Sequence, residues 1–272
     1  MLPAQQFVSV PRRPLVMGIV NVTPDSFSDG GLFNSFEHAL QHATQLVEDG
    51  ADWLDVGGES TRPGSMPVSV EEEIRRVIPV VEALVGMKHP VSVDTSKPEV
   101  MRAAISAGAT MINDVNALRA PGALEAVAAG GVGACLMHMQ GEPCSMQINP
   151  QYHDVVIEVR DFLLQRLHAA LEAGVPHERL IIDPGFGFGK TQTQNIQMLR
   201  HLDRFCDLGV PVMAGLSRKS MLGKMTGTGV DDRLHASVAA ALLAVSKGAG
   251  IVRVHDVKAT TDALAVYNTV NG

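Results

Sequence analysis

Polar side chains follow short apolar runs at eight places along this chain. The first run, LVMGIVN, ends on Asn21, and three later runs end on Asp94, Asn113 and Asp183. Carboxylate and amide oxygens can accept hydrogen bonds from a planar heterocycle rich in N–H donors, or they can ligate a divalent metal. The chain therefore carries the groups of a binding or catalytic site in pieces that lie far apart in sequence.

Basic and hydroxyl groups follow other apolar runs. Arg253 interrupts the apolar segment IVRV at an alternating position, and Arg62 and His255 also lie at loop or strand ends. Arginine forks suit phosphate oxygens. Lys219 could form a Schiff base as in barrel aldolases, but it lies several residues beyond its apolar run, which favours hydrogen bonding and charge. Ser217 has no neighbouring base in the sequence and no G-x-S-x-G turn, so we do not expect a nucleophile.

Residues 185–191 read GFGFGKT, a glycine-rich turn that invites comparison with a phosphate-binding loop. The motif G-x-x-x-x-G-K-[ST] needs a glycine where Pro184 stands, and the spacing G-x-G-x-x-G is also absent. We therefore interpret this segment as a glycine turn that shapes a pocket wall together with Phe188. Zinc is also disfavoured, because His138 and His255 are far apart and neither has a second histidine at ligand spacing.

Eight apolar runs alternate with helix-patterned segments, which is typical of an α/β protein with a (β/α)8 TIM barrel. The carboxyl ends of barrel strands face one mouth, where the polar residues would meet. A doubly wound open sheet is the alternative, but it would leave most strand-end groups away from its single switch point. We predict one domain over residues 1–272, with QFVSV near the N-terminus forming a short hairpin over the closed end.

Local signals predict where several elements begin and end. Asn34 resembles the start of a capping box and predicts that the first helix begins just after it, while Ser69 predicts the start of the second. Pro98 predicts the first residue of the third helix. The seventh strand is expected over residues 211–216, and the last helix is expected to end near Val266.

The composition excludes several classes of protein. The net charge of −7 and a pI near 5.8 argue against nucleic acid as a partner, because phosphate backbones need a broad basic surface. No segment approaches the roughly 18 uncharged apolar residues of a membrane span. The N-terminus does not resemble a secretory signal. The three cysteines follow no metal or C-x-x-C spacing, so we expect reduced thiols in a cytoplasmic protein.

Taken together, the motifs have a strong likeness to one family. They read MGIVNVTPDSFSDGG, DVGGESTRPG, VSVDTSKPEV, INDV, LMHMQG, LIIDPGFGFGK, GLSRKS and IVRVHDVK, in that order, from about Leu15 to Val266. This set resembles the dihydropteroate synthases, folate-pathway enzymes that are targets of sulfonamides. The resemblance implies condensation of 6-hydroxymethyl-7,8-dihydropterin diphosphate with 4-aminobenzoate, Mg²⁺ as cofactor, and a homodimer.

The resemblance also implies a role for particular residues. The pterin pocket would be lined by Asp94, Asn113, Met137, Asp183, Phe188, Lys219 and Arg253, of which Asp94, Asp183, Lys219 and Arg253 would be catalytic. The diphosphate would be bound by Asn21, Arg62, Arg253 and His255. The aminobenzoate side would be formed by Phe27, Thr61, Pro63, Ser217 and Lys219. Mg²⁺ would lie near Asn21 and Asp29.

The residue types agree with such a reaction. Departure of diphosphate builds negative charge on one side and a carbocation-like CH₂ on the other, so the site should offer cations to the first and carboxylates to the second. An aromatic amine is neutral at pH 7, so no strong general base is needed. Three other interpretations stay open, namely a pterin-binding methyltransferase barrel, a non-catalytic pterin-binding protein and a Schiff-base aldolase.

Overall fold

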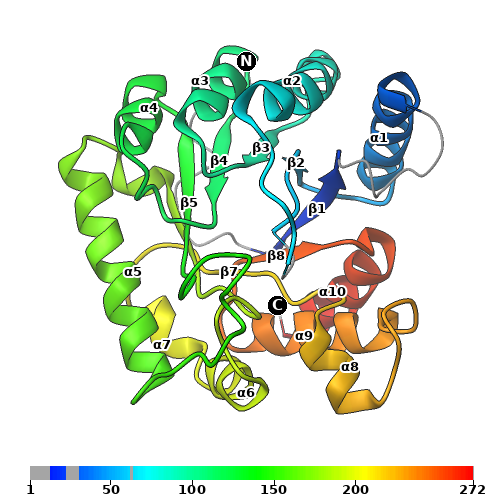
Figure 1. Cartoon of the computed structure of the whole chain (residues 1–272). Coiled ribbons are helices and arrows are strands. Elements are labelled where there is room, and N and C mark those ends of the chain that lie inside the picture. The colour runs from blue at the N-terminus through cyan, green and yellow to red at the C-terminus, as the bar shows by residue number, and fades with distance from the viewer. Residues whose placement is uncertain (1–12, 23–30, 62–63, 272) are drawn as a thin grey trace.

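The computed structural model describes residues 13–22, 31–61 and 64–271. Eight parallel strands lie at its centre with helices around them (Figure 1). The sheet order is β6-β5-β4-β3-β2-β1-β8-β7, and a parallel bridge between Ile182 and Val212 links β6 to the segment before β7. The strands are β1 (Leu15–Asn21), β2 (Trp53–Gly57), β3 (Val91–Asp94), β4 (Met111–Asp114), β5 (Gly133–Met137), β6 (Leu180–Asp183), β7 (Met213–Ala214) and β8 (Ile251–Val254). The predicted (β/α)8 barrel is confirmed.

The helices alternate with the strands and cover the outside of the barrel (Figure 1). They are α1 (Gly31–Glu48), α2 (Val70–Gly86), α3 (Pro98–Ser106), α4 (Ala123–Gly130), α5 (Val155–Glu172), α6 (Gln192–Arg200), α7 (Asp203–Cys206), α8 (Ser220–Thr226), α9 (Leu234–Ser246) and α10 (Val257–Asn271). Over the described ranges, none of them has both the length and the apolar character to cross a membrane.

Two predicted helix starts are confirmed and one is wrong. Ser69 is the N-cap of α2, where its hydroxyl accepts a hydrogen bond from the backbone N–H of Glu72 at 3.2 Å, and Pro98 is the first residue of α3. α1, however, begins at Gly31, so Asn34 lies inside the helix. An Asn–x–x–Glu spacing also fits one face of a continuing helix, so this pattern alone does not locate a helix start.

Two other predicted boundaries differ from the structure. α10 runs to Asn271 and not to Val266, since no glycine or proline interrupts the sequence between those positions. β7 contains only Met213 and Ala214, because only these two residues pair with β8. The predicted N-terminal hairpin lies outside the described residues.

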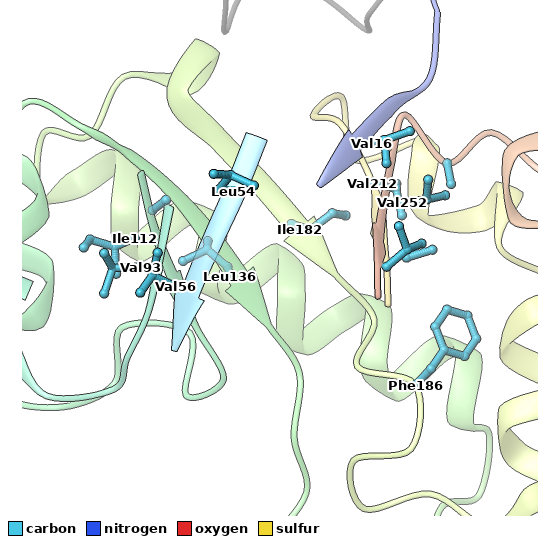
Figure 2. Packing of buried hydrophobic residues seen from close by; sticks show 14 of the residues in the cluster. Val16, Leu54, Val56, Val93, Ile112, Leu136, Ile182, Phe186, Val212 and Val252 are labelled. Atoms are coloured by element: carbon cyan, nitrogen blue, oxygen red, sulfur yellow. The ribbon is translucent and has the colours of Figure 1, made fainter. Parts of the chain in front are cut away.

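Alternation along the strands divides the core into two layers. Residues such as Val16 and Leu54 face the helices, and Figure 2 shows part of this outer cluster. Their neighbours, Met17 and Trp53, face the inside of the barrel, as expected for a period of two. The inner cluster consists of Met17, Trp53, Met111, Cys135, Ile181, Met213 and Ile251. Because these side chains fill the barrel, it has an apolar floor and not a pore.

Candidate active site

The site lies directly above the apolar floor. On a strand, residues two positions apart point to the same face. The residue two positions after each floor residue therefore also points into the barrel, one layer nearer the carboxyl ends of the strands. On five strands that position is occupied by Asp55, Asn113, Met137, Asp183 and Arg253. Asp94, at the end of β3, pairs in register with Asn113 on β4. Residues from six strands therefore meet at one end of the barrel.

Arg253 links two of these strands through carboxylates. Its Nε donates to Asp55 Oδ2 at 2.6 Å, and its Nη2 donates to Asp94 Oδ2 at 2.9 Å. Asn113 Nδ2 also donates to Asp55 Oδ2, at 2.9 Å. Among the residues that the structure describes, Asp55 Oδ1 and Asn113 Oδ1 are buried with no hydrogen-bond partner. Buried acceptors of this kind are costly to leave unpaired and are suited to a ligand that brings N–H donors.

Asp55 is the site residue that sequence reasoning missed. It is fully buried and occupies the middle of the apolar strand WLDVG. The signal was available, because a charged residue inside an apolar strand is the same feature that singled out Arg253. Burial alone would lower the pKa of Arg253, but the attraction of Asp55 and Asp94 outweighs burial and raises it. The guanidinium is therefore charged at every physiological pH.

The two strand-end carboxyls are tuned mainly by burial. Burial raises the pKa of Asp94 to about 7, although the nearby charge of Arg253 acts in the opposite direction. Burial also raises the pKa of Asp183, while the Lys219 ammonium and the Gly185 N–H, which donates to Asp183 Oδ1 at 2.7 Å, lower it. Each carboxyl is thus poised to gain from a ligand that donates hydrogen bonds to its ionised form.

Lys219 enters the site from the segment between β7 and α8. Its Nζ donates to the carbonyl oxygen of Phe186 and lies 4.7 Å from the centre of the Phe188 ring. Burial lowers the pKa of Lys219 to about 8, and Asp183 limits that shift. The side chain therefore remains mostly protonated at pH 7, which agrees with a role in charge and hydrogen bonding.

The glycine turn after β6 is pressed against the end of β5. Gly185 and Gly189 have positive φ angles, and a Cβ on Gly185 would lie 1.9 Å from the carbonyl oxygen of His138. Lys190 Nζ bonds inward, to His138 Nδ1 at 2.9 Å, Gly185 O at 2.9 Å and Phe188 O at 3.1 Å. Burial lowers the pKa of Lys190 well below its usual value, and the three partners around Nζ hold the amine in place. This lysine supports the turn and is not a phosphate ligand, in line with the rejected phosphate-loop motif.

An apolar wall borders the polar groups. Met137 and Phe188, both predicted as walls, lie in one cluster together with Val115, Met139 and Met146. Val115 and the two further methionines come from the segments that follow β4 and β5. The site therefore combines acids, an amide and cations with an apolar floor and one apolar side, a combination typical of small-molecule pockets.

Ser217 and His255 form a second polar pair. Ser217 Oγ lies 3.0 Å from His255 Nδ1 and accepts a hydrogen bond from the His255 backbone N–H at 3.1 Å. No base neighbours Ser217 in the sequence, but the fold places His255 beside it. The two residues are 38 positions apart, and only the adjacency of β7 and β8 brings them together.

The remaining predicted residues lie at the rim or outside the described residues. Asn21 ends β1 beside Gly57, whose added Cβ would lie 4.0 Å from Asn21 Oδ1, and Thr61 is partly buried in the loop after β2. In the ranges that the structure covers, no group of three or more His, Cys, Asp or Glu side chains is arranged to hold a metal. Four predicted site residues lie outside the described residues, namely Phe27, Asp29, Arg62 and Pro63.

A parallel barrel with acids, an amide and an arginine gathered at the carboxyl ends of its strands defines an enzyme of the (β/α)8 class with a site for a small polar molecule. Comparison with known proteins gives the particular family. The model of the pterin binding enzyme family matches residues 17–255, and the chain belongs to that family.

Relatives and solved structures of this family are similar over nearly the whole chain. Dihydropteroate synthase of Escherichia coli K12 is 51% identical over 255 residues, covering 93% of this chain and 90% of the relative. The structure of Xanthomonas albilineans dihydropteroate synthase with 4-aminobenzoic acid is 59% identical, with a TM-score of 0.91, and covers 96% of this chain and 94% of that chain. The same enzyme has been solved with 7,8-dihydropteroate at a TM-score of 0.89, with 56% identity and coverage of 97% and 96%. A Yersinia pestis dihydropteroate synthase in a sulfonamide drug complex is 46% identical, with a TM-score of 0.92 and coverage of 97% and 96%.

Proposed function

We propose that this chain condenses 6-hydroxymethyl-7,8-dihydropterin diphosphate with 4-aminobenzoate to give 7,8-dihydropteroate and diphosphate, the dihydropteroate synthase reaction. The observation that carries the proposal is the cluster of Asp55, Asp94, Asn113, Asp183 and Arg253 above the apolar floor. Relatives about half identical to this chain bear the name of that enzyme, and one neighbour contains the product.

The pterin ring would be held by acceptors at its edge. A pterin presents several N–H donors on one side, and carboxylates can accept parallel pairs of such bonds. Asp94 and Asp183 supply the carboxylates, Asn113 supplies an amide, and Arg253 lies against the ring. Met137 and Phe188 would cover the apolar faces. The buried oxygens of Asp55 and Asn113 that have no partner in the described part of the chain support this arrangement.

The diphosphate side would be formed by Asn21, Arg62, Arg253 and His255. If the Ser217 hydroxyl donates to His255 Nδ1, the neutral imidazole carries its proton on Nε2, where it can donate to a phosphate oxygen. Arg62 would add a forked pair of donors, and Arg253 would add the N–H groups that it does not donate to Asp55 and Asp94. Charge that develops on the departing diphosphate would thus meet groups already oriented to receive it.

Mg²⁺ would complete this side, with Asn21 and Asp29 as protein ligands. Mg²⁺ usually binds one or two protein oxygens together with substrate phosphates and water. The carboxamide of Asn21 at the end of β1 is an oxygen donor of that kind, so the residues fit the ion. When bound, Mg²⁺ would supply charge neutralisation for the leaving diphosphate.

The aminobenzoate would approach on the side of Phe27, Thr61, Pro63, Ser217 and Lys219. We infer a dissociative substitution, in which the bond from the pterin CH₂ to diphosphate breaks before the new C–N bond forms. Asp94 and Asp183 stabilise the positive charge that spreads over the ring. The neutral amine then attacks the CH₂ carbon and gives up one proton to water, so the residues need only orient the amine and balance charge.

Turnover by the pure protein tests this function. Protein incubated with Mg²⁺, the pterin diphosphate and 4-aminobenzoate should release diphosphate and dihydropteroate in equal amounts, measured by a coupled phosphate assay and by chromatography. A chelator should abolish both products. Tight pterin binding without turnover would favour a non-catalytic pterin-binding protein, and trapping of Lys219 by borohydride would favour an aldolase.

Three further properties accompany the proposal. Sulfonamides should compete with 4-aminobenzoate, because they resemble its shape and charge. We also propose a homodimer, for which the exposed Leu243 on α9 and Val266 and Val270 on α10 offer apolar surface on neighbouring helices. Sedimentation analysis of the pure protein would test the dimer. A cytoplasmic location is proposed from the three cysteines, none of which forms a disulfide.

A further inference from the structure

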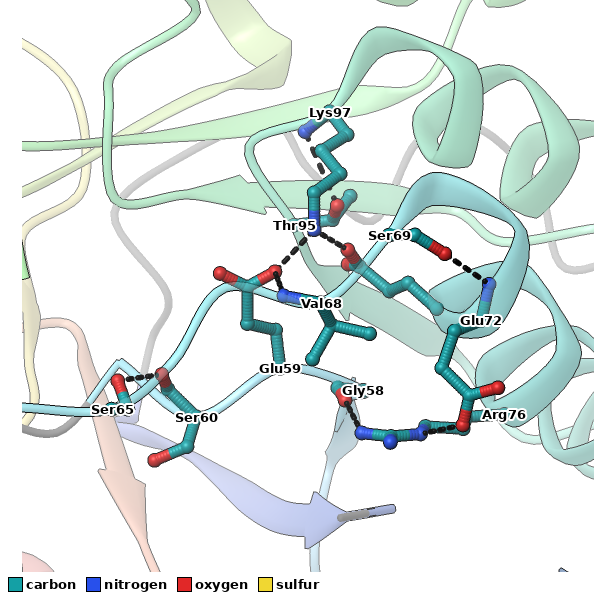
Figure 3. Close-up of polar contacts among 11 residues, drawn as sticks. Gly58, Glu59, Ser60, Ser65, Val68, Ser69, Glu72, Arg76, Thr95 and Lys97 are labelled. Carbon is teal, nitrogen blue, oxygen red and sulfur yellow. Dashed lines mark hydrogen bonds and ion pairs between the residues drawn. The ribbon is translucent and has the colours of Figure 1, made fainter.

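Lys97 lies between two carboxylates from different elements. It precedes α3, and its Nζ donates to Glu59 Oε2 in the β2–α2 loop, which the structure describes over residues 58–61 and 64–69. Its Nζ also donates to Glu73 Oε2, at 2.5 Å, in the first turn of α2 (Figure 3). In the sequence, Lys97 is 38 positions from Glu59 and 24 positions from Glu73. The ammonium group therefore connects the loop to two helices of the barrel wall.

The buried carboxylate of Glu73 needs the Lys97 ammonium group as its partner. Its side chain is 1% exposed, whereas Glu59 is 25% exposed and Lys97 is 22% exposed. Glu73 Oε1 has no hydrogen-bond partner among the described residues. A buried carboxylate without a cation is strongly destabilising, so Lys97 is held close to Glu73 by the protein interior. Its bond to Glu59 is then made from a fixed position.

Both ends of the β2–α2 loop are held in place, the far end by Glu59. Besides Lys97, its Oε2 accepts from the backbone N–H of Val68 at 3.3 Å. At the start of the loop, Gly58 is pressed against α2, since an added Cβ would lie 2.6 Å from Val77 Cγ2. Arg76 Nη1 donates to Gly58 O at 3.0 Å (Figure 3). The two ends of the loop are thus tied to α2 and α3 mainly through polar bonds.

This ionic cluster is close in sequence to two parts of the site. Glu59 is two residues before Thr61, which we place on the aminobenzoate side, and Lys97 is three residues after Asp94, which we place at the pterin ring. Gly57 and Asp94 are also register partners in adjacent strands. A shift of Glu59 relative to Lys97 would therefore move Thr61 while leaving the pterin acceptors in place.

We propose that Lys97, through Glu59, is a positioning residue that orients the β2–α2 loop for binding of 4-aminobenzoate. The proposal rests on the proposed function. It predicts a selective effect, because the cluster touches the loop on the aminobenzoate side and none of its three side chains bonds to the pterin acceptors.

Glu59→Gln is the decisive variant. It weakens the loop contact but leaves Lys97 paired with the buried Glu73, so the fold should survive. We expect the KM for 4-aminobenzoate to rise roughly tenfold, the size of one lost charge-assisted hydrogen bond, with the KM for the pterin diphosphate within about twofold of wild type. Hydrogen exchange, followed by mass spectrometry, should become faster in peptides covering residues 58–69 and stay unchanged elsewhere.

Companion variants separate positioning from simple stability. Lys97→Met should raise the same KM and also lower the melting temperature, because Glu73 loses its cation. Lys97→Arg keeps the cation and should restore the KM toward wild type. Lys258→Met, which removes an exposed lysine paired with Asp262 on α10, should change neither quantity.

The outcomes are distinct. If the KM for 4-aminobenzoate is unchanged in Glu59→Gln, or if both KM values rise equally, Lys97 does not position this loop. If the wild-type protein makes no dihydropteroate, the proposed function fails instead, and the exchange of residues 58–69 alone then reports whether the ionic cluster orders the loop.

Discussion

Asp94 shows how much of the chemistry depends on single side chains. It stands at the end of β3, accepts a hydrogen bond from Arg253 Nη2 and is buried enough that its pKa rises to about 7. The same guanidinium binds Asp55, so one cation serves two carboxylates. A ligand that adds N–H donors to Asp94 would favour the ionised form and lower that pKa.

The first prediction concerns the charge of Asp94. Asp94→Asn keeps the size of the side chain but replaces one acceptor oxygen by a donor. We expect kcat/KM for the pterin diphosphate to fall roughly 10- to 150-fold, corresponding to the loss of about 1.5–3 kcal/mol from a charge-assisted bond. The steady-state rate of diphosphate release measures this kcat/KM. Release indistinguishable from that of wild type would remove Asp94 from the mechanism.

The second prediction concerns pH. Because burial raises the pKa of Asp94 to about 7, the carboxyl takes up a proton as the pH falls through that value. The protonated form accepts fewer hydrogen bonds, so the Kd for a pterin should rise as the pH is lowered from 7.5 to 5.5, by up to about tenfold for each unit below the pKa. Calorimetric titration measures Kd. The Asp94→Asn protein serves as the control and should give a flatter profile, whereas equal slopes in both proteins would assign the titration to another group.

At the scale of elements, two loops form one wall. The turn after β6 lies against the segment after β5, with Tyr152 donating to Gly189 O at 2.8 Å and Gln147 Nε2 donating to Gly187 O at 2.5 Å. Lys190 ties the turn to His138 from within. Burial lowers the pKa of His138 to about 2, so this ring stays neutral and can accept a hydrogen bond from Lys190 Nζ. The wall that holds Phe188 is therefore fastened by side chains of one segment that bond to the backbone of the other.

A glycine substitution tests this contact. Gly185→Ala places a methyl group 1.9 Å from the His138 carbonyl oxygen at a φ of +71°, so the turn must move. We expect a loss of about 2–4 kcal/mol in the free energy of unfolding and weaker pterin binding. Urea denaturation and pterin titration measure these effects.

Gly86→Ala is the matched control, since nothing lies within 4 Å of its added Cβ at the end of α2. It should be neutral or should stabilise by up to about 1 kcal/mol. Equal effects of the two substitutions would show that the close approach at Gly185 is not important.

At the scale of the whole molecule, the barrel holds its site by filling its own interior. The apolar floor takes one side chain from each of seven strands, and the acids and the arginine stand on it. This layer excludes water from below, which is why burial dominates the pKa values of Asp94 and Asp183. Stability and electrostatic tuning thus come from the same packing.

Removal of one floor residue tests that link. Met111 is fully buried, and Met111→Ala should lower the free energy of unfolding by about 2–5 kcal/mol because it leaves a cavity. Met66, at 82% exposure, provides the control, and Met66→Ala should change stability by less than about 0.5 kcal/mol. Urea denaturation compares them. An unchanged free energy of unfolding in Met111→Ala would mean that the floor residues relax and fill the space.

The sequence determined the local features of this protein. Strand and helix periods depend on neighbouring residues, so the eight strands and the strand-end positions of Asn21, Asp94, Asn113 and Asp183 follow from pattern. Caps such as Ser69 follow for the same reason. The family motifs added the expected roles of the site residues, and all of these roles remain predictions.

Only the tertiary structure decided which distant groups meet. Asp55 and Arg253 are 198 positions apart, and Ser217 and His255 are 38 apart, so no local pattern could pair them. The length of β7 likewise depends on which of its residues find partners in β8. Hydrogen-bond partners and burial are properties of contacts between segments, and barrel closure creates those contacts. The sequence therefore supplied the chemical groups, and the closed barrel supplied their pairing and their pKa values.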